Sequence, residues 1–348
     1  MTVSAKKLDL DRVRAGLQRW FAERLAGADP VHVGPLQKAT SGFSSETLFV
    51  DVSHTTGGDE VEDHYVARLP PAGGGIFPTY DLSRQAEVQR VLLANGIPAA
   101  QPFAVELDEE WLGVPFFLMQ RVGGEVLTDG YVALGRLHDD GPDAQGRVQG
   151  EFLDRLADVH RIDWATADLG PLTPADARGL LHDVARLEEY LLWATEGDMP
   201  TIHAGAIGWL RANLPRSEPP LSLCWGDPRI SNVVYGPDWS QQALLDWEMA
   251  SIGAGEMDLA WFVALHELAS EAIGTDLPGF VGRQAMLDRW AERLGRPVVD
   301  FGWFEVLGLV RSDGIFLRIR SMLLAAGKDQ PWLRGPTPGQ IRIESRIS

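Results

Sequence analysis

The sequence predicts an α+β chain of two lobes, with a small β-rich lobe over residues 1–122 and a larger, mainly helical lobe over 123–348. Two observations predict this division. Apolar residues recur with the spacing of strands before the glycine pair Gly123-Gly124 and with the spacing of helices after it. The length of 348 residues is also enough for two compact units with separate cores.

The small lobe is expected to begin with a helix and to continue mainly as strands. A helix over 10–25 carries apolar residues on one face. Strands over 47–52 and 64–69 are separated by an acidic stretch rich in turn residues, which predicts a hairpin with a solvated loop. A helix capped by Asp81 or Ser83 and running to about Asn95, and an apolar strand over 114–122, complete this lobe.

The larger lobe is expected to be mostly helical. Two strand-like pieces, at 221–226 and 243–247, interrupt the helices, and the turn between them predicts that they pair as a hairpin. Helical spacing is found over residues 133–138, 152–160, 180–193 and 207–214, and again from about residue 257 onward.

Composition limits the classes of function. The 31 Lys and Arg against 49 Asp and Glu give a net charge of −18, which argues against the basic patches that nucleic acids and anionic membranes require. The one cysteine, Cys224, excludes an internal disulfide framework and a cysteine-rich zinc site. The N-terminal segment lacks the apolar run of a signal peptide, and no stretch has the apolar length of a membrane span. We therefore expect a soluble, cytoplasmic protein without nucleic-acid or membrane partners. The sequence does not predict its oligomeric state.

The segment CWGDPRISNVVYGPDWSQQALLDWE, residues 224–248, carries the residues best suited to chemistry. Asp227 and Asn232 follow the first predicted strand and Asp246 ends the second, so the predicted hairpin would bring them together. Carboxylate and amide oxygens suit Mg²⁺ held with phosphate, and a carboxylate beside such a metal can take the proton of a substrate hydroxyl. Arg229 adds a permanent cation for a transferring phosphoryl group. Taken alone, the spacing also fits polar residues that cap turns.

The segments WGDPRISN and LDWE resemble the catalytic and metal-binding segments of aminoglycoside phosphotransferases and their choline- and homoserine-kinase relatives, which have a protein-kinase-like fold. Other segments are similar to parts of that family in the family's order. TSGFSSETLFV resembles the loop that covers the phosphates, VARLPP the third strand, FFLMQRVGG the hinge that binds adenine, and LADVHRIDW a common helical segment. Within the family, the chain resembles the subgroup related to the kinase-like domain that animals carry fused to acyl-CoA dehydrogenases.

The resemblance implies a role for each matching residue. In the larger lobe, Asp227 would be the catalytic base and Arg229 the cation of the catalytic loop, while Asn232 and Asp246 would bind Mg²⁺. Asp258, in EMDLAWF, would brace the catalytic loop. In the small lobe the resemblance implies contacts with ATP or GTP from three places. The tip of the phosphate loop would contribute Gly42, Phe43 and Ser44, and the third strand would contribute Arg68 with its partner glutamate Glu87. The hinge would contribute Met119, Gln120 and Val122.

Three positions depart from the family pattern. Trp225 stands where many relatives have a histidine that orients the loop, a packing role that an aromatic residue can fill. Arg68 stands where most relatives have lysine, and Lys38 is a poorly placed substitute for it. The Asp-Phe-Gly segment of protein kinases reads Asp-Trp-Glu at 246–248, where Glu248 is a further candidate for metal or substrate contacts.

Two residues that often carry chemistry are interpreted as structural. Cys224 has no base near it in the sequence, so we expect a small core residue rather than a nucleophile. The eight histidines show no metal-binding spacing, and His160 is expected to be packed or hydrogen-bonded.

Together, the residues and the resemblance predict a Mg²⁺-dependent small-molecule phosphotransferase that moves the γ-phosphate of ATP or GTP to an acceptor hydroxyl bound in the larger lobe. The acidity of that lobe suits a cationic acceptor such as an aminoglycoside. The subgroup resemblance implies instead a kinase of a hydroxyacyl group or its CoA thioester. A third alternative, a catalytically inactive nucleotide-binding regulatory protein, is left open by Arg68 and Trp225.

Overall fold

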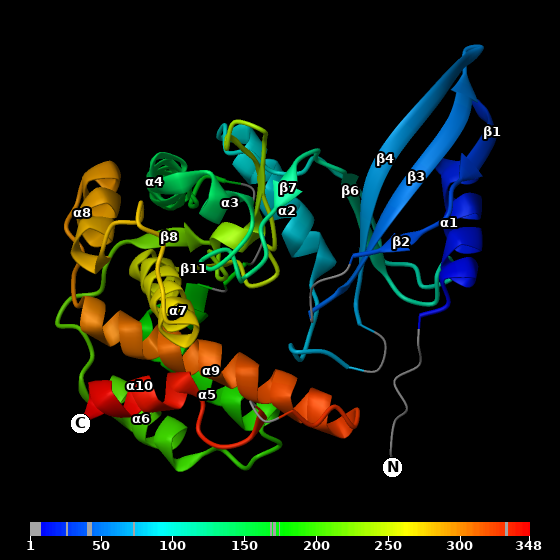
Figure 1. Cartoon of the computed structure of the whole chain (residues 1–348). Coiled ribbons are helices and arrows are strands. Elements are labelled where there is room, and N and C mark those ends of the chain that lie inside the picture. Colours follow the sequence, from blue (N-terminus) through cyan, green and yellow to red (C-terminus); the bar gives the residue numbers. More distant parts are fainter. Residues whose placement is uncertain are drawn as a thin grey trace. The chain divides into compact units, whose positions relative to one another are not determined.

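The computed structural model describes residues 8–25, 27–39, 44–71, 74–167, 169, 172–173, 175–330 and 333–348. The chain divides into two compact units, which are coloured along the sequence in Figure 1. The N-terminal unit comprises Met1–Arg90 and Ala100–Val122, and the C-terminal unit comprises Val91–Ala99 and Gly123–Ser348. The first is built on a sheet and the second is mainly helical, which confirms the predicted α+β class.

An antiparallel sheet of six strands forms the N-terminal unit. The strands are β1 (Ala28–Val33), β2 (Gln37–Lys38), β3 (Glu46–Thr56), β4 (Asp59–Leu69), β5 (Pro102–Glu106) and β6 (Phe116–Gln120). Their order across the sheet is β1-β3-β4-β6-β5, and β2 also pairs with β3. The strand that resembles the family's third strand and carries Arg68 is β4, which therefore lies in the middle of the sheet.

Helices pack on the two faces of this sheet. They are α1 (Leu10–Arg24) and α2 (Leu82–Ala94). Trp20 of α1 shares a buried cluster with Ala67 of β4, whereas Ala86 of α2 shares another with Val66. Because successive side chains of a strand point to opposite faces, Arg68 lies on the same face as Val66.

The hairpin of β3 and β4 is longer than the sequence predicts. The two strands pair over their whole length, including most of 53–63, where we expected a solvated loop. Gly57 and Gly58, both with positive φ, form the two-residue turn. The expectation was wrong because this outer part of the hairpin is largely exposed, so it lacks the apolar alternation by which a half-buried strand is recognised.

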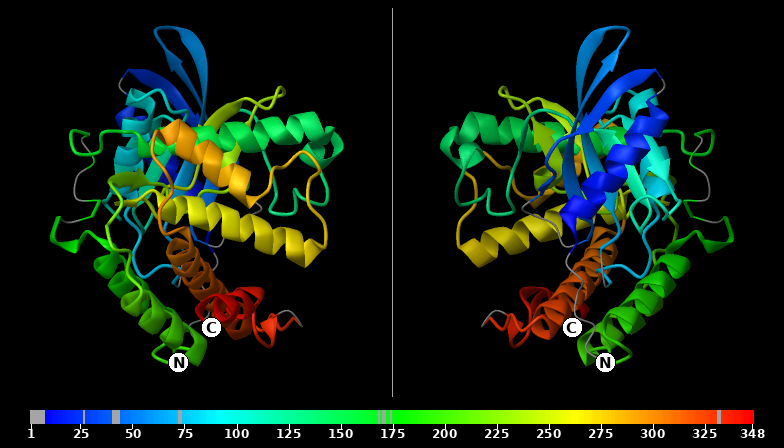
Figure 2. Two further views of the ribbon diagram at one scale, coloured as in Figure 1. Left: turned by 90° about the vertical axis from the view of Figure 1, so that its left-hand side faces the viewer. Right: turned by 90° about the vertical axis from the view of Figure 1, so that its right-hand side faces the viewer.

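The C-terminal unit consists of helices with two small sheets. Its helices are α3 (Arg136–Asp139), α4 (Gly141–His160), α5 (Leu180–Ala194), α6 (Thr201–Ala212), α7 (Glu256–Ile273), α8 (Arg283–Leu294), α9 (Phe301–Ala325) and α10 (Pro338–Ile347). Its strands are β7 (Glu125–Val126), β8 (Leu221–Cys224), β9 (Val233–Tyr235), β10 (Gln241–Leu244) and β11 (Ser251–Ala254). The long helix α9 packs against α5, α6, α7 and α10 (Figures 1 and 2). In the part of the chain that the structure describes, no helix is both long and apolar enough to cross a membrane.

The strand pieces at 221–226 and 243–247 do not pair with each other, so the predicted hairpin was wrong. Instead β8 pairs with β11, and β10 pairs with β9 in a sheet that also contains β7. The turn itself was predicted correctly, since Gly236 N donates to Ser240 O at 2.8 Å. The partner strand β9 has only three residues, which is too short to show a strand pattern.

Candidate active site

The candidate active site begins in the loop after β8. Residues 225–229 form this loop, and the 3₁₀ turn Ile230–Asn232 and β9 follow it directly. Gly226 has a φ of +92°, and a Cβ at this position would lie 2.3 Å from the carbonyl oxygen of Met249. Only glycine combines this φ with so close an approach. The loop after β8 is thereby able to pass directly against the chain that follows β10.

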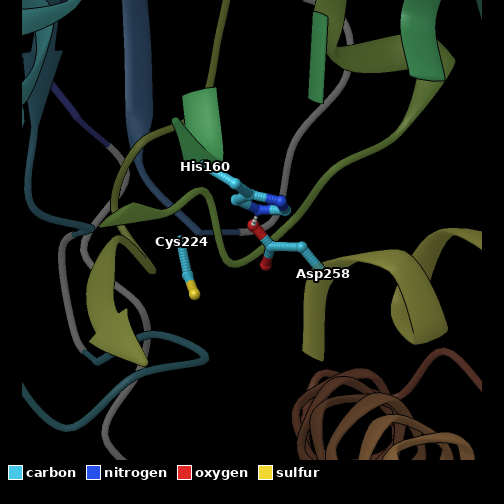
Figure 3. A group of neighbouring side chains, drawn as sticks. All are labelled: His160, Cys224 and Asp258. Atoms are coloured by element: carbon cyan, nitrogen blue, oxygen red, sulfur yellow. Dashed lines mark hydrogen bonds and ion pairs between the residues drawn. The ribbon is translucent and has the colours of Figure 1, made fainter. Parts of the chain in front are cut away.

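Asp258, in the first turn of α7, braces the loop in the way the resemblance implies. Its carboxylate accepts hydrogen bonds from Trp225 N at 2.6 Å and from Gly226 N at 3.0 Å. His160, at the end of α4, lies 3.1 Å from the same carboxylate through Nε2 (Figure 3). All three partners are buried, so the start of the loop is held from the interior of the unit.

Among the described residues, His160, Cys224 and Asp258 form the one group of three or more His, Cys, Asp or Glu side chains whose ligand atoms lie close enough to hold a metal ion, within 4.8 Å of one another (Figure 3). Each is already engaged. Trp290 Nε1 donates to His160 Nδ1 at 3.1 Å, so His160 Nε2 carries the proton that is donated to Asp258. Burial raises the pKa of the Cys224 thiol, and its Sγ lies 3.4 Å from the carbonyl oxygen of Ala254. The group is therefore a structural network, as the sequence interpretation of His160 and Cys224 expected.

Trp225 takes the place of the family histidine through packing and one hydrogen bond. Its Nε1 donates to the carbonyl oxygen of Leu245 at 2.8 Å. Its ring stacks on Trp247, with centroids 5.1 Å apart and an interplanar angle of 14°, and also contacts Phe152. Because Leu245 directly precedes Asp246, Trp225 ties the catalytic loop to the segment that carries the predicted metal ligand.

Asp227 is buried and accepts hydrogen bonds on both carboxylate oxygens. Trp261 Nε1 donates to Oδ1 at 2.9 Å. Arg229 donates to Oδ2 from Nε at 3.1 Å and from Nη2 at 2.7 Å, and Asn232 Nδ2 donates to Oδ2 at 3.0 Å. Burial raises the pKa of Asp227, the charge of Asp246 raises it further, and the guanidinium of Arg229 partly offsets both. A positioned carboxylate with a raised pKa is suited to accept a proton.

Arg229 connects Asp227 to a second carboxylate. Its Nη1 donates to the two carboxylate oxygens of Asp129 at 3.1 and 3.2 Å. Asp129 lies in the loop after β7 and also accepts a hydrogen bond from Ser231 Oγ at 2.5 Å. The planar guanidinium is therefore fixed along two edges, which sets the position of its charge beside Asp227.

Asn232 and Asp246 lie close together beyond the ends of β9 and β10. Leu245 N donates to Asn232 O at 2.8 Å, so Asp246 follows this contact directly. The amide nitrogen of Asn232 donates to the carbonyl and carboxylate oxygens of Asp227, which leaves the Asn232 amide oxygen for a ligand. Asp246 is half-buried, with a φ of +64°. Amide and carboxylate oxygens in this arrangement fit the donors that Mg²⁺ takes in proteins.

The predicted phosphate-binding residues of the N-terminal unit are only partly described. Gly42 and Phe43 lie outside the described residues, and Ser44 is buried. Arg68 is buried on β4 and donates to Ser45 Oγ from Nε at 3.2 Å and from Nη2 at 2.8 Å. The guanidinium is thus directed at the segment that leads into β3.

The predicted ion pair of Arg68 with Glu87 is not observed between these two described side chains. Glu87 is half-buried on α2, and the Arg68 fork is turned to Ser45 instead. Lys38, the substitute cation, forms an ion pair with Glu46 of the neighbouring strand. A cation on a strand and an acid on the helix that packs over the same face need not meet, because the direction of each side chain also decides which groups it can reach.

The predicted hinge residues lie at the end of β6 and just beyond it. Met119 is buried, and its Sδ lies 3.5 Å from Gln89 Nε2 of α2. Gln120 is exposed and its backbone N–H donates to Gln101 O at 2.9 Å, while Val122 is half-buried. Met119 therefore packs as a core residue of this unit, and the contact of these residues with adenine stays a prediction.

Comparison with known proteins identifies the family. Residues 35–296 match the model of the phosphotransferase enzyme family, and this span contains the catalytic loop and Asp246. The chain belongs to this family.

Solved structures of phosphotransferases share the fold. A putative aminoglycoside phosphotransferase from Ralstonia eutropha is 20% identical, with a TM-score of 0.65 over 95% of this chain and 94% of that chain. A choline/ethanolamine kinase family protein from Mesorhizobium loti is 15% identical, with a TM-score of 0.57 over 97% and 94%. The GDP complex of aminoglycoside 2′-phosphotransferase-IIIa is 13% identical, with a TM-score of 0.59 over 97% and 98%. These likenesses confirm the predicted kinase-like fold.

The curated relatives match the predicted subgroup. Acyl-CoA dehydrogenase family member 11 of Gallus gallus is 27% identical over 253 residues, which is 71% of this chain and 30% of that protein. The Homo sapiens protein of the same name is 27% identical over 64% of this chain and 27% of its own length. The chain thus spans about a third of the length of these relatives.

Two residues of the candidate site were not identified from the sequence. Trp261 lies three residues after Asp258 in EMDLAWF, so the spacing of a helix already placed both side chains on one face of α7. That signal could have been used. Asp129 reaches Arg229 from 100 residues away in the sequence, and no local pattern marks it.

Proposed function

We propose that the protein is a Mg²⁺-dependent phosphotransferase that moves the γ-phosphate of ATP or GTP to the hydroxyl of a small-molecule acceptor. The observation that carries this proposal is the set of contacts around Asp227. A buried carboxylate with a raised pKa is held by an indole, a guanidinium and an amide, with a second carboxylate, Asp246, close enough to raise that pKa further. Family membership supports the reaction class.

In this proposal Asp227 orients the acceptor hydroxyl and takes its proton as the hydroxyl oxygen attacks the γ-phosphorus, whose bond to the departing nucleoside diphosphate breaks. Arg229 compensates charge near the reacting atoms from its fixed position between Asp227 and Asp129. Asn232 and Asp246 would hold Mg²⁺, which when bound neutralises charge on the nucleotide phosphates. Trp261 keeps Asp227 in place through the bond to Oδ1.

The N-terminal unit would supply the nucleotide contacts. We assign Arg68 to the phosphates because it donates two hydrogen bonds to Ser45, which directly follows the predicted loop-tip residues Gly42, Phe43 and Ser44 in the sequence. Glu87 and the hinge residues Met119, Gln120 and Val122 complete the proposed nucleotide contacts. The neighbours that contain GDP or ADP support nucleotide binding as a property of this fold.

An inactive regulatory protein is the less favoured alternative. Arg68 and Trp225, the two departures that left it open, both have ordered roles, since Arg68 binds Ser45 and Trp225 binds Leu245. An inactive protein would not need to keep Asp227 hydrogen-bonded on both carboxylate oxygens beside a second carboxylate, Asp246. Two acceptor classes stay open, because the name of a structural neighbour points to an aminoglycoside and the names of the curated relatives point to an acyl group.

The test separates the two carboxylates. Asp227→Asn should bind Mg²⁺-nucleotide with nearly unchanged affinity and lose turnover by about 10²–10⁴-fold, because only the proton acceptor is removed. Asp246→Ala should weaken Mg²⁺-nucleotide binding itself. Binding is measured by calorimetry, and turnover by nucleoside diphosphate release with a panel of hydroxylated acceptors.

Asp154→Asn is the matched control, because this exposed carboxylate pairs with Arg289 on α8 and should change neither quantity. Normal turnover in Asp227→Asn would show that the base has been assigned wrongly. Normal Mg²⁺-nucleotide binding in Asp246→Ala would move the metal site, with Glu248 as the next candidate.

A further inference from the structure

Arg311 lies one indole ring away from the proposed catalytic base. It is half-buried on α9, and its guanidinium carbon lies 5.4 Å from the ring centroid of Trp261. The same indole donates its N–H to Asp227 Oδ1 at 2.9 Å. Both side chains belong to the C-terminal unit, where α7 and α9 pack together. The base and this cation are therefore placed relative to each other by a single rigid side chain.

The charge of Arg311 is not matched by a direct contact. Among the described residues, none forms an ion pair or a hydrogen bond with it. The carboxylates whose charge it feels have other partners: Asp227 binds Arg229, Asp258 binds two loop amides, and Asp183 binds Arg186. Burial lowers the pKa of Arg311, and the nearby charges of Asp258, Asp227 and Asp183 oppose this shift. A half-buried guanidinium without a direct partner costs stability, and a ligand that binds it would recover that cost.

The contact of Arg311 with the Trp261 ring is made through the guanidinium carbon and uses none of its N–H groups as hydrogen-bond donors. A guanidinium carries its N–H donors in a planar fork that matches the two oxygens of a carboxylate or phosphate. Arg318 follows Arg311 by seven residues on the same helix, and its guanidinium carbon lies 4.6 Å from the ring centroid of Trp193 on α5. Two turns of helix separate the two arginines, so they share one face of α9.

We propose that Arg311 binds an anionic group, a carboxylate or a phosphate, of the acceptor whose hydroxyl reaches Asp227. This inference rests on the phosphotransferase function proposed above and narrows its acceptor class to hydroxylated anions. A polycationic acceptor would instead bring like charges together at Arg311. The separation of one indole between cation and base implies an acceptor with its hydroxyl and its anionic group a few bonds apart.

The experiment compares matched acceptors that differ only in charge. Straight-chain hydroxy carboxylates with the hydroxyl at successive positions are assayed against their primary amides, and glycerol phosphate is assayed against glycerol, with kanamycin as the cationic arm. Nucleoside diphosphate release gives kcat and KM for each. We expect the wild type to prefer the anion of a pair by about 10–100-fold, the range of a charge-assisted hydrogen bond. The two pairs separate carboxylate from phosphate as the recognised group.

Arg311→Gln should abolish this preference by raising KM for the anion while leaving KM for the neutral partner unchanged. Arg311→Lys should restore part of it. Arg320→Gln on the same helix is the control, because Arg320 donates to the Gly335 carbonyl and should not affect acceptor choice. The stabilisation of Arg311→Gln by Mg²⁺-nucleotide should equal that of the wild type, which shows that the variant is folded.

Three outcomes would overturn the inference: equal use of charged and neutral acceptors by the wild type, a preference for kanamycin, or an unchanged preference in Arg311→Gln. If no acceptor is turned over, calorimetry with Mg²⁺ and a non-hydrolysable nucleotide decides, and failure of every carboxylate and of glycerol phosphate to bind refutes the role of Arg311. A failure of the proposed function itself is distinguishable, because no acceptor, charged or neutral, would then be turned over, whereas a failure of the Arg311 role alone leaves turnover without the preference for anions.

Discussion

Asp227 accepts hydrogen bonds from side chains that lie 2, 5 and 34 residues further along the sequence. The two near donors, Arg229 and Asn232, belong to the motif and could be found by its spacing. Trp261 belongs to α7 and could be found only by treating Asp258 and Trp261 as one face of a helix. Residue-level prediction therefore succeeded where the loop itself carries the chemistry and failed where another element supplies it.

Trp261→Phe isolates the indole N–H. The change keeps an aromatic ring beneath Arg311 but removes the hydrogen bond that stabilises the charged form of Asp227, so the pKa of Asp227 should rise further. Since the base must be ionised, activity falls as pH falls through this pKa, and the acid limb of the kcat profile should move to higher pH. We expect a loss of about 10-fold in kcat at neutral pH.

The kcat–pH profile measures this effect. Trp303→Phe serves as the control, because Trp303 donates its N–H to the Leu210 carbonyl in the core of the same unit. An acid limb that stays in place in Trp261→Phe would show that the indole does not tune the base.

Asp183, on α5, makes stability depend on pH. Burial raises its pKa to about 6, Arg186 and Arg311 oppose the shift, Glu218 adds to it and His182 opposes it weakly. The folded-state pKa lies above the unfolded value, so the native state binds more protons and this group's contribution to stability falls as pH rises from about 4 to about 6. Asp183→Asn cannot ionise and should escape this loss.

Urea denaturation of wild type and Asp183→Asn at pH 5.0 and pH 7.5 checks the sign. The free energy of unfolding of the variant, relative to the wild type, should increase by about 1–2 kcal/mol between the two pH values. The sign does not depend on how the new amide packs, because only the change with pH is compared. An equal pH dependence in both proteins would mean that Asp183 does not titrate in this range.

The elements that carry the site were predicted better than their pairing. The strand pieces on either side of the catalytic loop were both located, but their partners are β11 and the three-residue β9 rather than each other. A strand of that length has no periodicity to read, and pairing partners are set by contacts distant in the sequence. Asn232 and Asp246 still come together, because the β9–β10 pair ends beside them in the structure.

Strand β4 carries Arg68, where most relatives have lysine. Two substitutions separate the contribution of its charge from that of its planar shape. Arg68→Ala removes the cation and should raise the nucleotide KM by roughly 10–100-fold. Arg68→Lys keeps the charge but loses the fork that donates twice to Ser45, so we expect an intermediate KM.

Ser45→Ala is the companion variant, since it keeps the arginine and removes the observed acceptor of its fork. It should raise KM less than Arg68→Ala, and the double variant should be less than additive. A parent-like KM in Arg68→Ala would remove this residue from the nucleotide site. A double-mutant cycle of Arg68→Ala with Glu87→Gln tests the coupling that the resemblance implied, in the presence of nucleotide.

For the whole molecule, composition and the order of motifs predicted the two-unit α+β fold and the family. These predictions succeeded because several motif segments occur in the family's order along the chain. That order is a stronger indication than the spacing of residues within any one motif. The charge of the larger lobe did not identify an acceptor, because a net count does not locate charge. Arg311 is one cation among many in the sequence, and only the packing of α9 against α7 places it beside Trp261.

The central claim is that this chain binds a nucleoside triphosphate through Mg²⁺ held by Asn232 and Asp246. The most direct measurement is the melting temperature of the full chain with millimolar ATP or GTP, with and without Mg²⁺. We predict a modest rise without Mg²⁺ and a clearly larger rise with it, because a ligand that binds only the native state stabilises it by RT ln(1 + [L]/Kd). The same melting temperature with either nucleotide and Mg²⁺ as with neither would contradict the account.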